Sequence, residues 1–547
     1  MPKRSVKHKP KHKIQKHRLT RPRTHHLART SISHKDFVKS SFLSKKLFSI
    51  GKFNFPVEYL ILILILIFAF YLRIMFLGAP AFWADESISA IASKNILEKG
   101  VPVFDSGVFY GRALVYHYSE ALSLLAFGLN DFAARFPSVI FGMLTVLLAF
   151  FIGREYSKKA GLVAALFTAT FFLEVFFSRQ GRFYSLFQLA FFSSLFFLYK
   201  SKNNQKWIYP ALFTFALAVD TNPYGIMLAP FFILEYFFFK KRVKKETRGR
   251  GKTNLKQKFL FLLIPIVILV AQGIDIISVF FGSLAAKVGR GEGMNFYASL
   301  AQEFKSQTFF TMPFVSILCA AGAFWAYFKN KRLTLIIIAP SIFVLAGLYF
   351  SSDFALRYFY FIIFPIVLFA GALFGFVAEN KKQIIPVLIV LGVLLVVCSN
   401  IFFPNSFGFA LLAPSENLID ASAPEISFAG IPASVHAELM DSGSVVVSLY
   451  SPPVEWYLKK PKYVLPFSLN GTYADEISIK KDGELVDIYS GSEVIRGLDE
   501  LSGKFFFIEE YFASSKLELT KKIALDSVKK RCSFRFANKS IAIFECN

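Results

Sequence analysis

The chain has 547 residues, of which 54% are hydrophobic, and its mean hydropathy is +0.48. The apolar residues lie in long runs, which excludes a soluble enzyme, a disordered protein and a small disulfide scaffold. The net charge of +26 does not indicate nucleic-acid binding, because most of it lies in two segments beside apolar runs. Residues 1–56 hold 16 Lys and Arg against one acid, and residues 240–258 hold ten against one. This placement is typical of the cytoplasmic ends of membrane spans.

Eleven apolar runs approach the length of about 20 residues that a helix needs to cross a hydrocarbon core of about 30 Å. They lie at 57–77, 136–153, 160–177, 184–199, 207–220, 223–239, 259–282, 309–328, 334–350, 356–378 and 384–404. A twelfth run, 113–128, contains His117 and Glu120. Placing it along the outer surface puts five loops that all carry Lys on the inner side: 153–161, 199–206, 240–258, 329–332 and 379–383. The sequence therefore predicts an all-α, multi-pass cell-membrane protein with about 11 transmembrane helices, a cytoplasmic N-terminus and extracytoplasmic juxtamembrane helices in its first loop.

The sequence changes character after Pro404, where apolar runs become shorter and charges mix. Segments 444–450, 504–511 and 540–546 are typical of strands, and 515–530 of an amphipathic helix. We therefore expect three parts: a basic, disordered cytoplasmic tail at 1–56, a membrane domain at 57–404 and a small extracytoplasmic α/β domain at 405–547. Cys532 and Cys546, near the C-terminus, could pair.

Two adjacent carboxylates, Asp85 and Glu86, follow the first span by a few residues. On a helix they would point about 100° apart, so they rarely face one partner. One interpretation makes them the cap and first-turn acid of a helix. The other makes them catalytic groups at the outer membrane face.

Basic and aromatic residues gather at the same predicted face. Arg179 and Arg182 are spaced i,i+3 and would share a helix face, either as a site that needs positive charge or as snorkelling arginines. His117, with Arg112 nearby, could ligate a divalent metal together with Asp85, orient a substrate, or be structural. A basic pocket at a membrane boundary suits a lipid phosphate, and a neighbouring carboxylate suits an acceptor hydroxyl or a metal. These groups together favour transfer of a group carried on a lipid phosphate.

The order of motifs over roughly residues 57–378 resembles that of the integral-membrane GT-C glycosyltransferases that use polyprenyl-phosphate sugars. The nearest branches are the protein O-mannosyltransferase-like and lipid-A aminoarabinose-transferase-like proteins. The motifs are WADE (83–86), ARFPS (134–138), GREYSKKAG (153–161), SRQGRFYSL (178–186) and RYFYFIIFP (357–365).

The resemblance implies that Asp85 and Glu86 are catalytic and that Arg179 and Arg182 bind the donor. Tyr184 stands where many relatives have Asp, which leaves metal dependence open. The remaining expected substrate-binding residues are Arg112, His117, Tyr184, Arg357 and Tyr358. The implied activity moves a sugar from dolichyl or undecaprenyl phosphate to a lipid, glycan or protein acceptor at the outer face, among membrane lipids and without nucleic acid. The alternative is a transporter or scaffold of lipid-linked glycans without catalysis.

The loop charges generate a prediction about topology. A cysteine introduced at Ser442 should react with a membrane-impermeant thiol reagent added to intact cells, because residues 405–547 are expected outside. A cysteine at Thr247, inside the basic segment 240–258, should react only after permeabilisation. The unsubstituted chain measures the background from its own cysteines, and the reverse labelling pattern would contradict this topology.

Overall fold

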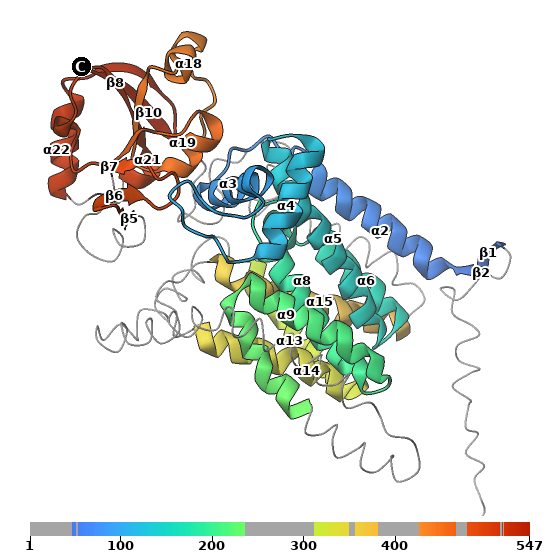
Figure 1. Ribbon diagram of the computed structural model, residues 1–547. Helices are drawn as coiled ribbons and strands as arrows, with labels where there is room; N and C mark the ends of the chain where they lie inside the picture. Colours follow the sequence, from blue (N-terminus) through green and yellow to red (C-terminus); the bar gives the residue numbers. More distant parts are fainter. Residues whose placement is uncertain are drawn as a thin grey trace, which may run out of the picture. The chain divides into compact units, whose positions relative to one another are not determined.

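A computed structural model describes residues 46–50, 53–235, 311–348, 356–380, 426–465, 478–514, 517 and 519–547 (Figure 1). Contacts divide the chain into two units, Met1–Val57 and Glu58–Asn547. In the first unit, β1 (Lys46–Ile50) pairs antiparallel with β2 (Phe53–Pro56). This hairpin lies within the segment predicted as the basic tail.

The second unit begins with a helical part. Its elements are α2 (Val57–Ile74), α3 (Ala84–Lys99), α4 (Leu114–Phe127), α5 (Asp131–Arg154), α6 (Lys158–Thr170), α7 (Phe172–Phe177), α8 (Tyr184–Ser201), η2 (Gln205–Trp207), α9 (Ile208–Thr221), η3 (Pro223–Leu228), α13 (Thr311–Lys329), α14 (Lys331–Leu348) and α15 (Leu356–Asn380). Within the part of the chain that the structure describes, three helices are long and apolar enough to cross a membrane: Val57–Ile74, Asp131–Arg154 and Tyr360–Glu379. Two shorter apolar helices are Pro223–Glu235 and Val315–Lys329.

The expected count of eleven spans is not confirmed among the described residues. The run 160–177 is divided into α6 and α7, because Phe171 has an extended backbone (ψ 127°) and ends the first helix. The runs 259–282 and 384–404 lie outside the described residues. The run 113–128 forms α4, which has 14 residues and is too short to cross about 30 Å of hydrocarbon.

Helices α6 and α15 pack closely because small residues meet at their contact. Gly371 and Gly375 of α15 lie against Ala164 and Ala160 of α6. A Cβ atom added at Gly375 would come within 2.3 Å of the Ala160 Cα, so no larger residue fits there without movement. Contacts of this kind are typical of helices that pack inside a membrane.

The C-terminal part is an eight-stranded sheet with strand order β5-β6-β7-β4-β3-β8-β10-β9. Its strands are β3 (Val445–Ser448), β4 (Tyr463–Val464), β5 (Ser478–Lys481), β6 (Glu484–Asp487), β7 (Glu493–Val494), β8 (Phe505–Glu510), β9 (Ser533–Ala537) and β10 (Ile541–Cys546). Its helical elements are α18 (Ala433–Met440), α19 (Ser451–Tyr457), η6 (Leu498–Glu500), α21 (Tyr511–Ser514) and α22 (Leu519–Lys529). Strands β7, β4, β3 and β8 run parallel, whereas β10, β9, β6 and β5 are added antiparallel.

This sheet confirms the predicted C-terminal domain of strands and helices. The three predicted strands appear as β3, β8 and β10, and the predicted amphipathic helix appears as α22. Cys532 and Cys546 form a disulfide bond, which the sequence had left open. The Phe505–Glu510 strand is buried along its whole length, as expected for a central strand.

The C-terminal sheet and helix α3 share one hydrophobic core. Ile88 and Ile91 of α3 pack in the same cluster as Val447, Phe507 and other residues of the sheet. Backbone contacts reinforce this packing, because the Ile426 N–H donates to the Phe82 carbonyl (3.0 Å). The first loop after α2 and the C-terminal domain are therefore held together as one body around α3.

Candidate active site

The first turn of α3 contains the two predicted acids, and they occupy different environments. Glu86 is buried, with 2% of its surface exposed, and its Oε2 accepts a hydrogen bond from the Trp83 N–H (3.3 Å). Arg135 of α5 binds both carboxylate oxygens, with Nε 2.8 Å from Oε1 and Nη2 2.7 Å from Oε2. The Gly181 N–H donates to the same Oε1 (2.5 Å). Glu86 therefore joins α3, α5 and the turn that precedes α8.

Arg135 uses its remaining donors on the segment between α2 and α3. Its Nη1 donates to the carbonyls of Leu77 (3.0 Å) and Pro80 (2.7 Å), and its Nη2 donates to that of Ala81 (3.1 Å). The guanidinium is 4% exposed, so the charge would be costly to bury without these partners. The Glu86–Arg135 pair thus sets the position of the first loop.

Asp85 points away from this pair and remains partly accessible, with 27% of its side chain exposed. Its Oδ2 lies 3.8 Å from Nη2 of Arg182 and accepts a hydrogen bond from the Tyr184 hydroxyl (3.5 Å). The divergence follows from helix geometry, because neighbouring side chains point about 100° apart. The structure therefore brings Asp85, Arg182 and Tyr184 together.

Arg182 is buried and is held from several sides. Its Nη1 donates to the Asp85 carbonyl (3.0 Å), the Ser89 hydroxyl (2.6 Å) and the Tyr110 hydroxyl (3.5 Å). Burial lowers its pKa, but Tyr110, Asp85 and Tyr184 outweigh burial and raise the pKa well above the ordinary value. The guanidinium is therefore a permanent, oriented cation beside Asp85.

Arg179 does not join this group. Residues 178–183 form turns instead of a helix, so the i,i+3 spacing does not place Arg179 and Arg182 on one face. Arg179 instead donates to the carbonyls of Leu72 (3.3 Å) and Phe76 (3.5 Å), at the end of α2. Its position fits an anchor for α2.

Arg112 and His117 lie on the other side of Arg182. The guanidinium carbons of Arg112 and Arg182 stand 4.6 Å and 4.5 Å from the centre of the Phe183 ring. Burial, followed by the positive charges of Arg182 and Arg112, lowers the pKa of His117 to about 3, so its imidazole is neutral at pH 7. Both arginines therefore lie within electrostatic reach of His117.

Three nitrogen atoms of this cluster are buried without a hydrogen-bond partner in the described part of the chain. They are Nε of Arg112, Nε2 of His117 and Nε of Arg182. Nδ1 of His117 lies 3.3 Å from the Ser93 hydroxyl and 3.5 Å from Glu120, so its other ring nitrogen remains for a further contact. Unused donors beside two cations form an environment that favours an anion.

The predicted site also included Arg357, Tyr358 and a possible divalent metal. Arg357 and Tyr358 belong to the first turn of α15, but their side chains lie outside the described part of the structure. Among the residues that the structure describes, no three His, Cys, Asp or Glu side chains gather as ligands of one ion. The set around Asp85 is instead rich in arginine and tyrosine, which does not fit a divalent cation.

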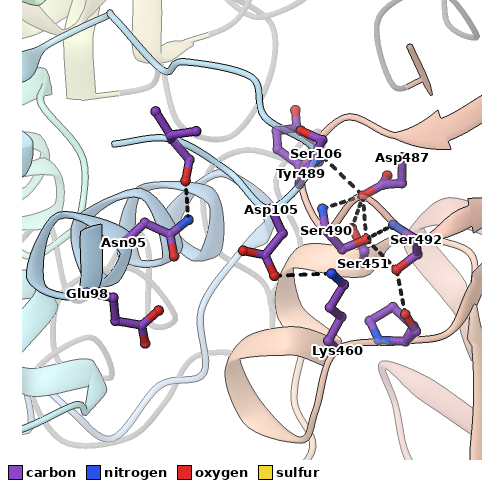
Figure 2. A network of polar contacts seen from close by, with 12 residues as sticks. Asn95, Glu98, Asp105, Ser106, Ser451, Lys460, Asp487, Tyr489, Ser490 and Ser492 are labelled. Atoms are coloured by element: carbon purple, nitrogen blue, oxygen red, sulfur yellow. Dashed lines mark hydrogen bonds and ion pairs between the residues drawn. The ribbon is translucent and has the colours of Figure 1, made fainter. Parts of the chain in front are cut away.

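The C-terminal domain contacts the first loop through the turn 487–492, called here the Asp487 turn (Figure 2). Asp487 Oδ2 accepts hydrogen bonds from the Ser451 hydroxyl (2.7 Å) and the Ser490 N–H (2.8 Å). Ser106 of the first loop donates to the Ile488 carbonyl. Gly491 has φ +65°, and a Cβ there would lie 2.9 Å from the Ser106 nitrogen, so the turn touches the loop directly.

This turn adds aromatic residues that sequence reasoning missed. The Tyr489 ring contacts Phe104 (centroids 5.3 Å apart) and Tyr450 (6.3 Å). Burial and neighbouring charges that include Asp85 raise the pKa of Tyr450 and Tyr489, whereas Arg182 acts in the opposite direction. Both tyrosines therefore lie within electrostatic reach of Asp85 and Arg182. No local motif marks them, because they are more than 360 residues from Asp85.

One protein-family model and several solved structures are similar to this chain. Residues 111–271 match the family model described as "Dolichyl-phosphate-mannose-protein mannosyltransferase". The fold resembles that of ArnT from Cupriavidus metallidurans bound to undecaprenyl phosphate, with TM-score 0.55 and 12% identity over 89% of this chain and 97% of that chain. These findings confirm the predicted resemblance to the GT-C glycosyltransferases.

Two further relatives are more distant or only partial. An oligosaccharyltransferase from Archaeoglobus fulgidus, tethered to an acceptor peptide containing the NVT sequon, has TM-score 0.50 and 10% identity, with 89% of this chain and 74% of that chain covered. An uncharacterized protein from Aquifex aeolicus (strain VF5) is 28% identical over 198 residues, which is 34% of this chain and 38% of that protein. The match thus spans less than two fifths of that relative's length, and the likeness to the solved structures shows the fold alone.

The geometry of Glu86 generates a prediction about stability. Glu86→Gln replaces one carboxylate oxygen by a donor and leaves Arg135 without its counter-charge. Breaking a buried ion pair in this way costs roughly 3–5 kcal/mol. We expect the purified variant to unfold at a clearly lower temperature in detergent, whereas Asp85→Asn should unfold close to the unsubstituted protein. Equal melting temperatures for Glu86→Gln and the unsubstituted protein would contradict the structural role of this pair.

Proposed function

We propose that this protein is a glycosyltransferase that moves a sugar from a polyprenyl-phosphate donor to an acceptor hydroxyl at the outer face of the membrane. The observation that carries the proposal is the pairing of an accessible carboxylate, Asp85, with the buried cation Arg182 just after the first apolar helix. The donor class is supported by the bound undecaprenyl phosphate of ArnT and by the name of the matching family model.

The donor phosphate is assigned to the cluster of Arg112, His117 and Arg182. Two guanidinium groups on one aromatic ring repel each other unless an anion lies nearby. Their unused Nε atoms and the unused His117 Nε2 would supply donors to phosphate oxygens. A neutral His117 can offer one N–H without adding a third positive charge.

Asp85 is assigned the role of general base, and Glu86 a positioning role. The two oxygens of Glu86 are engaged by Arg135 and Gly181, and its side chain is buried, so it cannot meet an acceptor. Asp85 is partly exposed on the adjacent face. A base must come within hydrogen-bond reach of the hydroxyl from which it removes a proton, and of the two acids only Asp85 is accessible for this contact.

The reaction then balances without a further reagent. The acceptor oxygen attacks the anomeric carbon of the sugar, and the bond between that carbon and the phosphate oxygen breaks. The proton of the acceptor hydroxyl passes to Asp85. The leaving polyprenyl phosphate keeps the bonding electron pair, and Arg182 and Arg112 stabilise its increased negative charge.

The C-terminal domain is assigned to the acceptor side. Tyr489 of the Asp487 turn and Tyr450, which precedes α19, lie within electrostatic reach of Asp85. Ser106 secures this turn to the first loop (Figure 2). Tyr110 links the two sides, because its hydroxyl accepts from Arg182 while its ring contacts His117 (centroids 5.1 Å apart). The acceptor would enter between these tyrosines and Asp85.

Asp85→Asn tests the base. Asparagine keeps the size of the side chain, and the structure places Asp85 inside the first turn of α3, whose N-cap is Trp83 and not Asp85 as one sequence interpretation had it, so no cap is lost and insertion and stability should be retained. Transfer should fall by about a hundredfold or more, as is typical when a general base is lost. The measurement is transfer of label from a panel of polyprenyl-phosphate sugars by membranes that contain the variant. Asp105→Asn, the same change elsewhere in the first loop, is the matched control and should retain most of the activity.

Arg182→Lys tests the phosphate assignment. Lysine keeps the charge but loses the planar guanidinium that satisfies Asp85, Ser89 and Tyr110 at once. We expect the donor KM to rise or kcat to fall by about tenfold, the equivalent of one charge-assisted hydrogen bond. Arg179→Lys should have a smaller effect, because Arg179 binds carbonyls of α2. If the Arg179 variant loses more donor affinity than the Arg182 variant, the assignment is wrong.

A further inference from the structure

A cavity of about 560 Å³ lies beside a different face of α3. It is lined by residues of α3, the turn between α4 and α5, and α19, and it contains none of the residues assigned to catalysis. Lys94, which lines it, is nine residues from Asp85, so the two side chains lie about half a turn apart around the helix. Its volume is in the range of ordinary ligand sites, which is roughly 300–1,000 Å³.

Most polar groups in the walls of this cavity already have hydrogen-bond partners. Asp131 accepts hydrogen bonds from the indole Nε1 of Trp456 (2.9 Å) and from the hydroxyl of Tyr457 (2.7 Å). Asn130 uses its Oδ1 to accept from the Ala133 N–H (2.9 Å), as the cap of α5. These polar atoms hold the wall together, and the rings of Trp456, Tyr457 and Phe132 remain as lining.

Two opposite charges remain for a ligand. Oε2 of Glu455 is buried without a hydrogen-bond partner among the described residues. Lys94 has one ion pair, with Glu98 at 3.6 Å, and Glu98 is half exposed. Burial, followed by the negative charge of Asp105, raises the pKa of Glu455 to about 7, whereas Lys94 acts to lower it. The Glu455 Oε2 atom thus lacks a positively charged hydrogen-bond partner among the described residues, although Lys94 lies within electrostatic reach.

The cavity adjoins an apolar stripe on α4. Val115, Tyr118, Leu122, Leu125 and Leu129 recur every three or four residues and are 45–71% exposed. The spacing places the four of these residues that belong to α4 on one face, and Leu129 follows them just after the helix ends at Phe127. Such a face is typical of a helix lying on a membrane surface. Leu129 itself lines the cavity, and the ring of Phe127 packs edge-on against Phe132 of the cavity wall (5.7 Å).

We propose that this cavity binds the headgroup of a zwitterionic phospholipid with a primary amine, such as phosphatidylethanolamine. The phosphate would contact Lys94, the ammonium group would donate to Oε2 of Glu455, and the acyl chains would run along the stripe of α4. The inference does not depend on the proposed transfer reaction, because it uses a separate cavity and a binding measurement.

The chemistry of the cavity favours this headgroup over its alternatives. An anionic lipid headgroup would satisfy Lys94 but leave Glu455 beside added negative charge. A choline group carries charge but has no N–H to donate to Glu455. A saccharide would need hydroxyl partners, and the indole and phenol groups that often supply them are already used by Asp131.

The test is native mass spectrometry of the full chain, purified without phosphatidylethanolamine and titrated with dioleoyl phosphatidylethanolamine. Phosphatidylglycerol and phosphatidylcholine with the same chains serve as comparison lipids. Glu455→Gln should weaken phosphatidylethanolamine binding by about tenfold, the equivalent of one charge-assisted hydrogen bond, and should not weaken phosphatidylglycerol binding, because it removes negative charge beside that headgroup. Lys94→Gln should weaken binding of both lipids. Glu98→Gln, the matched control on the same helix, should bind both lipids as the unsubstituted chain does.

Several outcomes would overturn the proposal. Equal binding of the three lipids by the unsubstituted chain, or unchanged phosphatidylethanolamine binding by Glu455→Gln, would show that Glu455 does not select the amine. Competition by octyl glucoside that depends on Glu455 would make the cavity a sugar site instead. If the unsubstituted chain transferred no sugar from any donor of the panel but bound the lipid normally, only the proposed function would be contradicted, so the two proposals fail separately.

Discussion

The buried ion pair of Glu86 and Arg135 is the contact on which the rest of the site depends. Taking two charges out of water costs several kcal/mol per ion, and this cost is offset only when geometry is good and the remaining donors are used. Here both carboxylate oxygens are engaged, and the guanidinium also binds carbonyls of the segment between α2 and α3. An apolar pair of the same volume could pack as well, but it could not hold Gly181 or this segment in place. The ion pair therefore provides geometry: it places the turn that carries Arg182 next to the first turn of α3.

The adjacent acids show what the sequence could predict and where its information ended. The start of a helix at Asp85 and Glu86 follows from local rules, as does the expectation that the two carboxylates diverge. Which carboxylate faces inward depends on Arg135, and the sequence contains no local sign of that pairing. The same limit explains Arg179 and Arg182: their spacing favours a shared helix face, whereas Gly181 is held by Glu86 within a series of turns. In both cases a residue from another helix, Arg135 for the two acids and Glu86 for the turn at Gly181, decides the local conformation.

Long-range pairing also explains why the C-terminal contribution was missed. The strands β3, β8 and β10 could be predicted because hydrophobic periodicity and β-branched or aromatic composition are local signals. The contact of Ser106 with the Ile488 carbonyl joins residues 382 positions apart and leaves no such signal. The expected eleven membrane spans are not confirmed among the described residues, and the run 160–177 shows one reason. An apolar run indicates burial, but it does not show whether the buried segment is one helix or two. The run 160–177 forms two short helices that are separated at Phe171.

Helix α3 differs from an ordinary surface helix, and its amino-acid composition explains how it can contribute to both candidate sites, the Asp85 cluster and the cavity at Lys94. It is buried along most of its length, with Ser87, Ala90 and Ser93 at or near complete burial. Small side chains let the C-terminal domain, α4 and the turn before α8 approach it closely. Larger polar side chains then occur where those neighbours leave space, with Asp85 on one face and Lys94 on the opposite face. A single rigid helix can in this way hold a carboxylate beside Arg182 and an ammonium group beside the apolar stripe of α4, without either charge neutralising the other.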